Sequence, residues 1–345
     1  MEGNDNKKHP AGIDVAVLML FFNRPKQLAE VFAEVKKARP SKLFLYQDGP
    51  RGEHDMAGIE GCRKIVEDID WQCEVHRNYC QQNQGCDPSE YLSQKWAFNY
   101  VDKCIVLEDD DVPSQSFFAF CKEMLDRYAD DKKVWMVAGF NAEEKTKYVS
   151  SDYFFTTNFS IWGWASWRRV IDTWDATYQF LDDKASVEKI ERLINEGKLR
   201  KEFLQMCRDH RASGIAYYET IFWSSMILND ALAIMPSRNL INNRGVTADS
   251  THYSASLETT PHRLRRIYTM PRYELTFPLR HPEKVEDYDH HRQNVYRIHA
   301  WGHPFIKICY SVEELFLNLI HGNFSLIGKA MKRRIGIWKN GRRYN

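Results

Sequence analysis

The chain has 345 residues, 43% of them hydrophobic, so it is long enough to bury the core of one large domain. Its 48 Lys and Arg residues and 47 Asp and Glu residues leave a formal charge of +1, which excludes nucleic-acid binding through bulk charge. None of the eight cysteines forms a C-x-x-C pair, and the polar stretch 1–14 is unlike a signal peptide, so a reducing cytoplasm is expected.

Strand and helix patterns alternate along the first 140 residues. The expected elements are, in chain order, a doubly buried strand at 15–22, a helix around 28–35, a strand at 42–46, a helix at 59–69, a short strand at 73–76, a helix at 89–100, a strand at 104–107, a helix around 117–128 and a strand at 134–137. This alternation predicts an α/β fold with a mostly parallel, doubly wound sheet flanked by helices.

Four consecutive acids, Glu108 to Asp111, follow directly on the apolar strand at 104–107. Ionised carboxylates cannot continue into the core without partners, so they must lie at the carboxyl end of the strand, where open α/β sheets bind ligands. Clustered carboxylates repel one another unless a cation neutralises them, which predicts a divalent metal that prefers oxygen ligands. The alternative is a solvated acidic surface or a helix cap.

Polar residues also follow the first two strands. Arg24 lies in the segment Asn23-Arg24-Pro25, and Asp48 begins Asp48-Gly49-Pro50. Both are predicted to line one crevice with the acids. Arg24 suits a phosphate, with a solvated loop arginine as the alternative, and Asp48 alone is equally explained by a surface turn. A Gly-rich phosphate loop is missing, which disfavours a dinucleotide-binding fold or a P-loop enzyme.

The stretch 158–167 is rich in tryptophan. Gly163 between Trp162 and Trp164 allows close backbone approach, and indole faces suit the C–H surfaces of sugars, so these three residues are predicted to contact a sugar or acceptor. The alternative is a helix start that places Trp164 and Trp167 in the core.

Further downstream, a lone acid lies in an aromatic setting. Burying the carboxylate of Glu219 there costs free energy unless it has a catalytic role or an ion-pair partner. Glu219 is therefore a candidate general base, and a structural Glu paired to an arginine is the alternative. Arg244 is a candidate contact for a diphosphate. His252 is a candidate metal ligand, although a lone histidine is more often structural.

In order and spacing, these motifs resemble the GT-A fold glycosyltransferases. The resemblance is carried by strand-Asn-Arg-Pro, strand-Gln-Asp-Gly-Pro and Val-Leu-Glu-Asp-Asp-Asp-Val-Pro-Ser-x-x-Phe-Phe, and it spans about residues 15–253. The chain is most similar to bacterial family 2-like enzymes, which include a hemolysin-like group, and to N-acetylglucosaminyltransferase I-type enzymes. The resemblance implies a Rossmann-like GT-A sheet. It also implies a hexosyl- or N-acetylhexosaminyltransferase that uses a nucleotide-sugar, with a UDP-sugar favoured.

The resemblance also implies roles for single residues. Asp48 would contact the nucleobase, Asp109 the ribose or donor sugar, and Asp110 a Mn²⁺ or Mg²⁺ ion. The loop after the first strand would lie beside the nucleoside through Phe22, Asn23 and Arg24. Similar enzymes usually carry aspartate where this chain has Glu219.

The expected reaction is therefore metal-dependent transfer of a sugar to a glycan or lipid-linked acceptor hydroxyl, with inversion. Residues 13–140 would bind the nucleotide-sugar, residues 141–260 the acceptor, and residues 261–345 would form a C-terminal extension. A nucleotidyltransferase and an inactive carbohydrate-binding relative are the alternatives.

The C-terminal tail is amphipathic and then basic. No acid occurs in residues 329–345, which carry Lys329, Lys332, Arg333, Arg334, Lys339, Arg342 and Arg343. This pattern suits an anionic membrane surface, and hence a peripheral location on the cytoplasmic side of the inner membrane. A docked helix with a disordered basic end is the alternative.

Overall fold

The computed structural model describes residues 8–194, 196–246, 257–324 and 327–328. Its strands are β1 (Ile13–Phe21), β2 (Pro40–Gln47), β3 (Glu74–Tyr79), β4 (Lys103–Glu108), β5 (Asp111–Pro113), β6 (Val134–Ala138), β7 (Tyr153–Thr156), β8 (Trp164–Trp167), β9 (Leu232–Pro236) and β10 (Ile241–Asn243). Its helices are α1 (Pro25–Ala38), α2 (Met56–Val66), α3 (Cys86–Phe98), α4 (Gln115–Arg127), α5 (Arg168–Ile171), α6 (Lys184–Leu193), α7 (Gly197–Ser213), α8 (Tyr218–Leu228), α9 (His262–Thr269), α10 (Asp289–His299) and α11 (Pro304–Ile320).

The main sheet has eight strands in the order β3-β2-β1-β4-β8-β6-β9-β7. Strands β3, β2, β1 and β4 are parallel to one another, and β6 and β9 share their direction because β8 is antiparallel to both β4 and β6. Only β8 and the edge strand β7 run the other way. The α/β fold with a mostly parallel sheet, predicted from the alternation of elements, is therefore confirmed, and it is Rossmann-like, as the resemblance implies.

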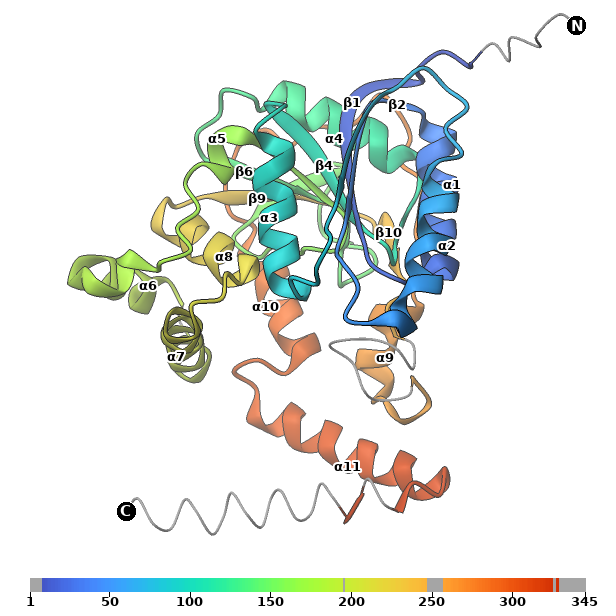
Figure 1. The fold of residues 1–345 in the computed structure, drawn as a ribbon. Helices are drawn as coiled ribbons and strands as arrows, with labels where there is room; N and C mark the ends of the chain where they lie inside the picture. The colour runs from blue at the N-terminus through green and yellow to red at the C-terminus, as the bar shows by residue number, and fades with distance from the viewer. Residues whose placement is uncertain (1–7, 195, 247–256, 325–326, 329–345) are drawn as a thin grey trace, which may run out of the picture.

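Helices flank the sheet, which explains why its central strands are apolar without alternation. Helix α1 contacts α2 and α4, while α3 contacts α5 and α8 (Figure 1). Strand β1 touches both α3 and α4, and its residues from Val15 to Phe21 are all buried. A strand covered on both faces has no solvent side, so its sequence is a continuous apolar run.

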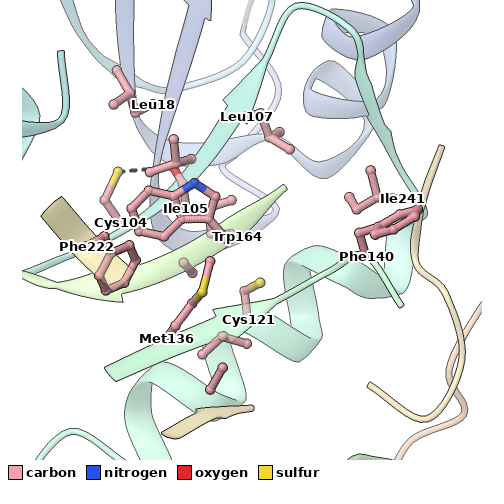
Figure 2. Packing of buried hydrophobic residues seen from close by; sticks show 14 of the residues in the cluster. Leu18, Cys104, Ile105, Leu107, Cys121, Met136, Phe140, Trp164, Phe222 and Ile241 are labelled. Carbon is pink, nitrogen blue, oxygen red and sulfur yellow. Dashed lines mark hydrogen bonds between the residues drawn. The ribbon is translucent and has the colours of Figure 1, made fainter. Parts of the chain in front are cut away.

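The end of the tryptophan-rich stretch 158–167, for which a helix start was the alternative interpretation, is a strand in the middle of the sheet. All four residues of β8 are buried, and Trp164 is completely inaccessible to solvent. Figure 2 shows the Trp164 indole in the core near Phe222 and Ile105. Strand β8 lies between β4 and β6, and successive side chains on both of its faces are buried; α5 begins only at Arg168.

A second, two-stranded sheet joins distant parts of the chain. Strands β5 and β10 pair antiparallel, with Asp111 opposite Asn243. Strand β5 begins at Asp111, the last residue of the acid run, so this pairing brings the segment after β9 beside the acids.

The C-terminal segment contributes to the main core before it leaves it. Ile267, Met270, Leu275 and Leu279 are buried in the same apolar cluster as the sheet. Helix α11, by contrast, lies apart from the sheet at the bottom of Figure 1. Among the described residues, no helix combines the length and apolar character needed to cross a membrane.

Candidate functional site

Three polar strand ends meet at one edge of the sheet. Strand β1 lies between β2 and β4, with Phe21 opposite Gln47 and Leu20 opposite Glu108. The residues that follow these three strands therefore lie side by side, as predicted for the carboxyl edge of a parallel sheet. They line a pocket of about 300 Å³, whose walls include Phe22, Asn23, Arg24, Asp48, Glu90, Glu108 and Asp109.

Arg24 lies inside this crevice and pairs with two of the acids. Its guanidinium forms an ion pair with Asp109 and another with Asp110 Oδ2, the latter at 2.8 Å. Burial alone would lower the pKa of Arg24, but the charges of Asp109 and Asp110 raise it above its usual range. Burial raises the pKa of Asp109 to about 6, although Arg24 opposes this rise. Arg24 is therefore the local counter-charge for the acid pair.

Neighbouring residues hold the carboxylate of Asp110 in place. Its Oδ1 accepts a hydrogen bond from Asn243 Nδ2 at 3.1 Å. A Cβ atom on Gly245 would lie 2.5 Å from Asp110 Oδ2, so the backbone at position 245 approaches this oxygen too closely for any side chain. Asn243 and Gly245 thus fix the position of Asp110.

Asp111 has a structural task that the sequence did not reveal. It is completely buried, its Oδ2 accepts the Gly163 backbone N–H at 2.8 Å, and its Oδ1 accepts from Asn243 Nδ2 at 3.2 Å. Burial and the adjacent Asp110 charge raise the pKa of Asp111 well above its ordinary value. Asp111 thus ties the acid run to the start of β8 and to β10.

The crevice holds more acid than base among the described residues. Burial also raises the pKa values of Glu90 and Glu108 well above the ordinary range, and the acids around each of them add to the rise. A bound proton or cation relieves the repulsion among such crowded, buried carboxylates. Carboxylate oxygens are the ligands that Mg²⁺ and Mn²⁺ prefer, so the donor set around Asp110 fits a divalent ion.

Asp48 organises the opposite wall of the pocket. Its carboxylate accepts hydrogen bonds from the backbone N–H groups of Gly49 and Gln84, both at 2.8 Å, and from Asn83 Nδ2, also at 2.8 Å. It therefore fixes the loop before α3 as part of the pocket instead of standing in an isolated surface turn.

The loop after β1 is held from the other side. Asn23 Nδ2 donates to Asp55 Oδ1 at 2.6 Å, and the Arg51 guanidinium lies over the Phe22 ring at 5.0 Å from its centroid. An aromatic ring, an amide and a fixed carboxylate thus converge at one end of the pocket, an arrangement that suits a planar ligand.

The two tryptophans predicted to contact sugar differ in position. Trp162 is half-buried, and its ring lies against Phe140 and Tyr268. Trp164 packs against Trp174 and Phe222 with no exposed surface, so it belongs to the core and offers no face to a sugar. The core alternative therefore describes Trp164. Gly163 lies between them with φ of 63°, in the left-handed region.

Glu219 lies among other acids. It is half-buried in the first turn of α8, and one of its oxygens lies within 4.8 Å of carboxylate oxygens of Asp87 and Glu90. Both of these acids belong to α3, and Glu90 also lines the pocket. Sequence reasoning missed Asp87 and Glu90; the signal was their spacing of three residues at the start of a helix, which also fits a simple helix cap.

Two predicted residues, Arg244 and His252, remain to be placed relative to the acid run. The Arg244 backbone N–H donates to the Asp110 carbonyl at 2.8 Å, while its side chain is 52% exposed and reaches Glu30 at 3.5 Å. His252, the predicted metal ligand, lies outside the described residues.

Replacing Arg24 with glutamine is expected to lower the free energy of unfolding in EDTA by about 3 kcal/mol, because two buried carboxylates lose their counter-charge. Mn²⁺ should restore most of this loss by binding the same carboxylates. Urea unfolding with EDTA and with Mn²⁺ measures both effects. Arg280→Gln is the control, since its ion pair with Asp152 is exposed and should contribute less than about 1 kcal/mol. Equal losses in the two variants would contradict the assignment.

Gly163→Ala is expected to destabilise the chain by about 2–4 kcal/mol, because it combines backbone strain with overpacking. The new Cβ would meet Ile241 Cδ1 at 2.5 Å, at a residue whose φ is positive. Gly214 is a matched control with φ of 69° and no atom within 4 Å of an added Cβ, so Gly214→Ala carries only the backbone strain. Thermal unfolding that ranks the two variants equally would show that the contact with Ile241 is unimportant.

No protein-family model and no curated protein matches the sequence. Among solved structures, a UDP-glucose pyrophosphorylase complexed with UDP-glucose is 9% identical, with 47% of this chain and 79% of that chain covered and a TM-score of 0.29. An apo UDP-glucose pyrophosphorylase is 9% identical, with 67% of this chain and 93% of that chain covered and a TM-score of 0.36. The inositol-1-phosphate CTP transferase from T. maritima is 12% identical, with 47% and 74% covered and a TM-score of 0.27. These similarities are too weak to carry an argument about activity.

Proposed function

We propose that the protein is a metal-dependent glycosyltransferase that moves a sugar from a UDP-sugar to an acceptor hydroxyl. The observation that carries this proposal is one crevice at the carboxyl edge of the sheet. Asp48, Glu90 and Asp109 line its pocket, Asp110 follows Asp109 in the chain, and the half-buried Glu219 lies within 4.8 Å of Glu90 from a different element. A nucleotide site, a cation site and a candidate base in one place are the parts that sugar transfer needs.

The donor would lie along the β1, β2 and β4 ends. Phe22, Asn23 and Asp48 would hold the nucleobase end, and Asp109 the ribose or donor sugar. Arg24 and Arg244 would meet the diphosphate, for which Arg24 must exchange one carboxylate partner for a phosphate oxygen. Residues 13–140 would thus form the donor half of the domain.

Asp110 would hold a Mn²⁺ or Mg²⁺ ion, and His252 is a further candidate ligand. When bound, such an ion supplies Lewis-acid stabilisation of the leaving diphosphate. The chain's own contribution is to keep Asp110 in place through Asn243 and the close approach of Gly245.

Glu219 would take the proton from the acceptor hydroxyl as that oxygen attacks the anomeric carbon. The bond to the diphosphate breaks on the opposite face, so one displacement inverts the anomeric centre. Trp162 and Gly163 would border the acceptor, a glycan or a lipid-linked saccharide, within a half formed by residues 141–260. Trp164 is not included because its indole is buried in the core.

A panel of nucleotide-sugars with Mn²⁺, followed by thermal shift and by release of free nucleotide, tests the proposal. A UDP-sugar is expected to raise the melting temperature only with Mn²⁺, and to be hydrolysed slowly without an acceptor. Release of pyrophosphate from UTP and a sugar 1-phosphate would instead indicate a nucleotidyltransferase. That activity is disfavoured because α1 begins at Pro25, directly after β1, without a Gly-rich loop. Binding without any turnover would indicate a carbohydrate-binding relative.

We also propose that the C-terminal segment docks on an anionic membrane surface at the cytoplasmic side. Helix α11 exposes an apolar stripe at helical spacing, formed by Phe305, Ile308, Val312, Phe316 and Ile320, each at least 60% exposed. The basic residues 329–343 follow it in the sequence and lie outside the described residues. An apolar stripe followed by a run of cations suits anionic lipid, and the location would serve a lipid-linked acceptor.

Vesicle flotation tests this docking. Removing residues 325–345, or replacing Phe305 and Phe316 with serine, is expected to reduce binding to anionic vesicles by at least about tenfold. Tyr148→Ser, at a side chain exposed elsewhere on the surface, is the control. Equal flotation of every form, or equal binding to zwitterionic vesicles, would overturn the proposal.

A further inference from the structure

A second group of acids borders the crevice and is distinct from the acid run after β4. It comprises Asp87 and Glu90 in the first turns of α3 and Glu219 in the first turn of α8. One carboxylate oxygen from each lies within 4.8 Å of the other two, and Asp110 is not part of this group. The two helices contact each other, so the folded core holds these acids together.

Two buried polar atoms around this group lack partners among the described residues. Glu90 is 8% exposed, and its Oε1 accepts a weak hydrogen bond from Cys86 Sγ, but its Oε2 accepts none. The Tyr218 hydroxyl is fully buried and unpartnered. Burial, and then the charges of Glu108 and Glu90, raise the pKa of this hydroxyl, which places it beside the same acids. Buried polar groups are nearly always satisfied, so both atoms indicate a ligand.

The Arg24 guanidinium, which lies in the crevice, is already paired with Asp109 and Asp110. The amino ends of α3 and α8 each contribute about half a positive charge, which favours single acids but does not match three carboxylates. A bound cation or a shared proton would relieve the mutual repulsion of these carboxylates.

We propose that Asp87, Glu90 and Glu219 bind a second divalent cation, in addition to the ion expected on Asp110. Three carboxylates from two rigid helices offer the oxygen ligands that Mn²⁺, Mg²⁺ or Ca²⁺ prefer. The proposal rests on the proposed function in one respect only: bound there, a cation keeps Glu219 ionised, as a general base must be.

Counting Mn²⁺ ions on the full chain, stripped with EDTA and titrated under electron paramagnetic resonance, tests the proposal. Wild type is expected to bind a second Mn²⁺ per chain. Glu90→Gln should lower the Mn²⁺ affinity of the second site by at least about tenfold and leave the affinity of the Asp110 site unchanged. Asp110→Asn should lower the affinity of the Asp110 site and leave the second site unchanged. Glu202→Gln, on an exposed carboxylate of α7, is the control and should keep both ions.

Thermal unfolding of Glu90→Gln checks that the variant folds and gives an independent readout. In EDTA this variant should melt above wild type, because it removes one of the crowded charges, and Mn²⁺ should abolish the difference. A single Mn²⁺ that depends on Asp110 alone, or an unchanged count in Glu90→Gln, would overturn the second site. Two bound ions in a protein without sugar transfer would refute the proposed function and leave the cation site standing.

Discussion

Glu219→Gln is expected to lower the rate of sugar transfer by about 10²–10⁴-fold, because a neutral amide cannot accept the proton of the acceptor hydroxyl. Nucleotide binding should be kept, since Phe22, Asn23 and Asp48 line the pocket from the ends of β1 and β2, whereas Glu219 is on α8. Transfer to the acceptor that emerges from the panel, measured together with UDP affinity, separates the two effects. The loss should appear in kcat more than in the KM of the donor.

The matched control for this variant is Glu202→Gln, the same change at a side chain that is 60% exposed on α7. It should leave transfer unchanged. Activity of Glu219→Gln within a few-fold of wild type would show that another group takes the proton. A parallel loss of nucleotide binding would indicate a structural role for Glu219.

Asp110→Asn is expected to slow transfer by about 10²–10³-fold, which corresponds to about 3–4 kcal/mol of lost stabilisation of the leaving diphosphate. It should also remove the Mn²⁺ dependence of UDP binding. The amide keeps the size of the side chain and its contact with Asn243, so folding should be preserved. Isothermal titration of UDP with and without Mn²⁺ measures the dependence directly.

Asp102→Asn is the control for Asp110→Asn, because Asp102 precedes the same strand and its side chain is 90% exposed. It should behave as wild type. Chelator-resistant transfer in wild type, or Mn²⁺-dependent UDP binding that survives in Asp110→Asn, would refute the metal assignment.

The strand ends of the site could be predicted because, at each of them, an apolar run changes to polar residues within a few positions. Each of β1, β2 and β4 contains an unbroken apolar run, at 15–21, 43–46 and 104–107, and polar residues follow each run within one or two positions. In a parallel sheet such ends must share an edge, so Arg24, Asp48 and Asp109 were expected together and lie around one pocket. No long-range information was needed for this step.

The tie made by Asp111 could not be predicted, because its partner lies far along the chain. Asn243 is separated from it by 132 positions and reaches it only through the pairing of β5 with β10. The three-residue strands involved are too short to show a pattern.

The strand β8 and the acids of α3 were missed for different reasons. Four buried residues rich in tryptophan show neither the alternation of a half-exposed strand nor the period of a helix, so Trp164 to Trp167 fitted both. Asp87 and Glu90 begin a helix at a spacing that also caps helices. Their meeting with Glu219 depends on how α3 packs against α8.

The reversed direction of β8 has a consequence for how this protein can change. An antiparallel strand presents its beginning, not its end, at the edge where ligands bind, so the segment 157–162 leads into the crevice. The Gly163 backbone N–H donates a hydrogen bond to Asp111, which fixes the residue directly after that segment to the acid run. Phe159, Ile161 and Trp162 of that segment pack against the main core, so a replacement segment must keep these apolar contacts. Under the proposed function, changes at the other positions between 157 and 162 are therefore the natural route to a new acceptor preference.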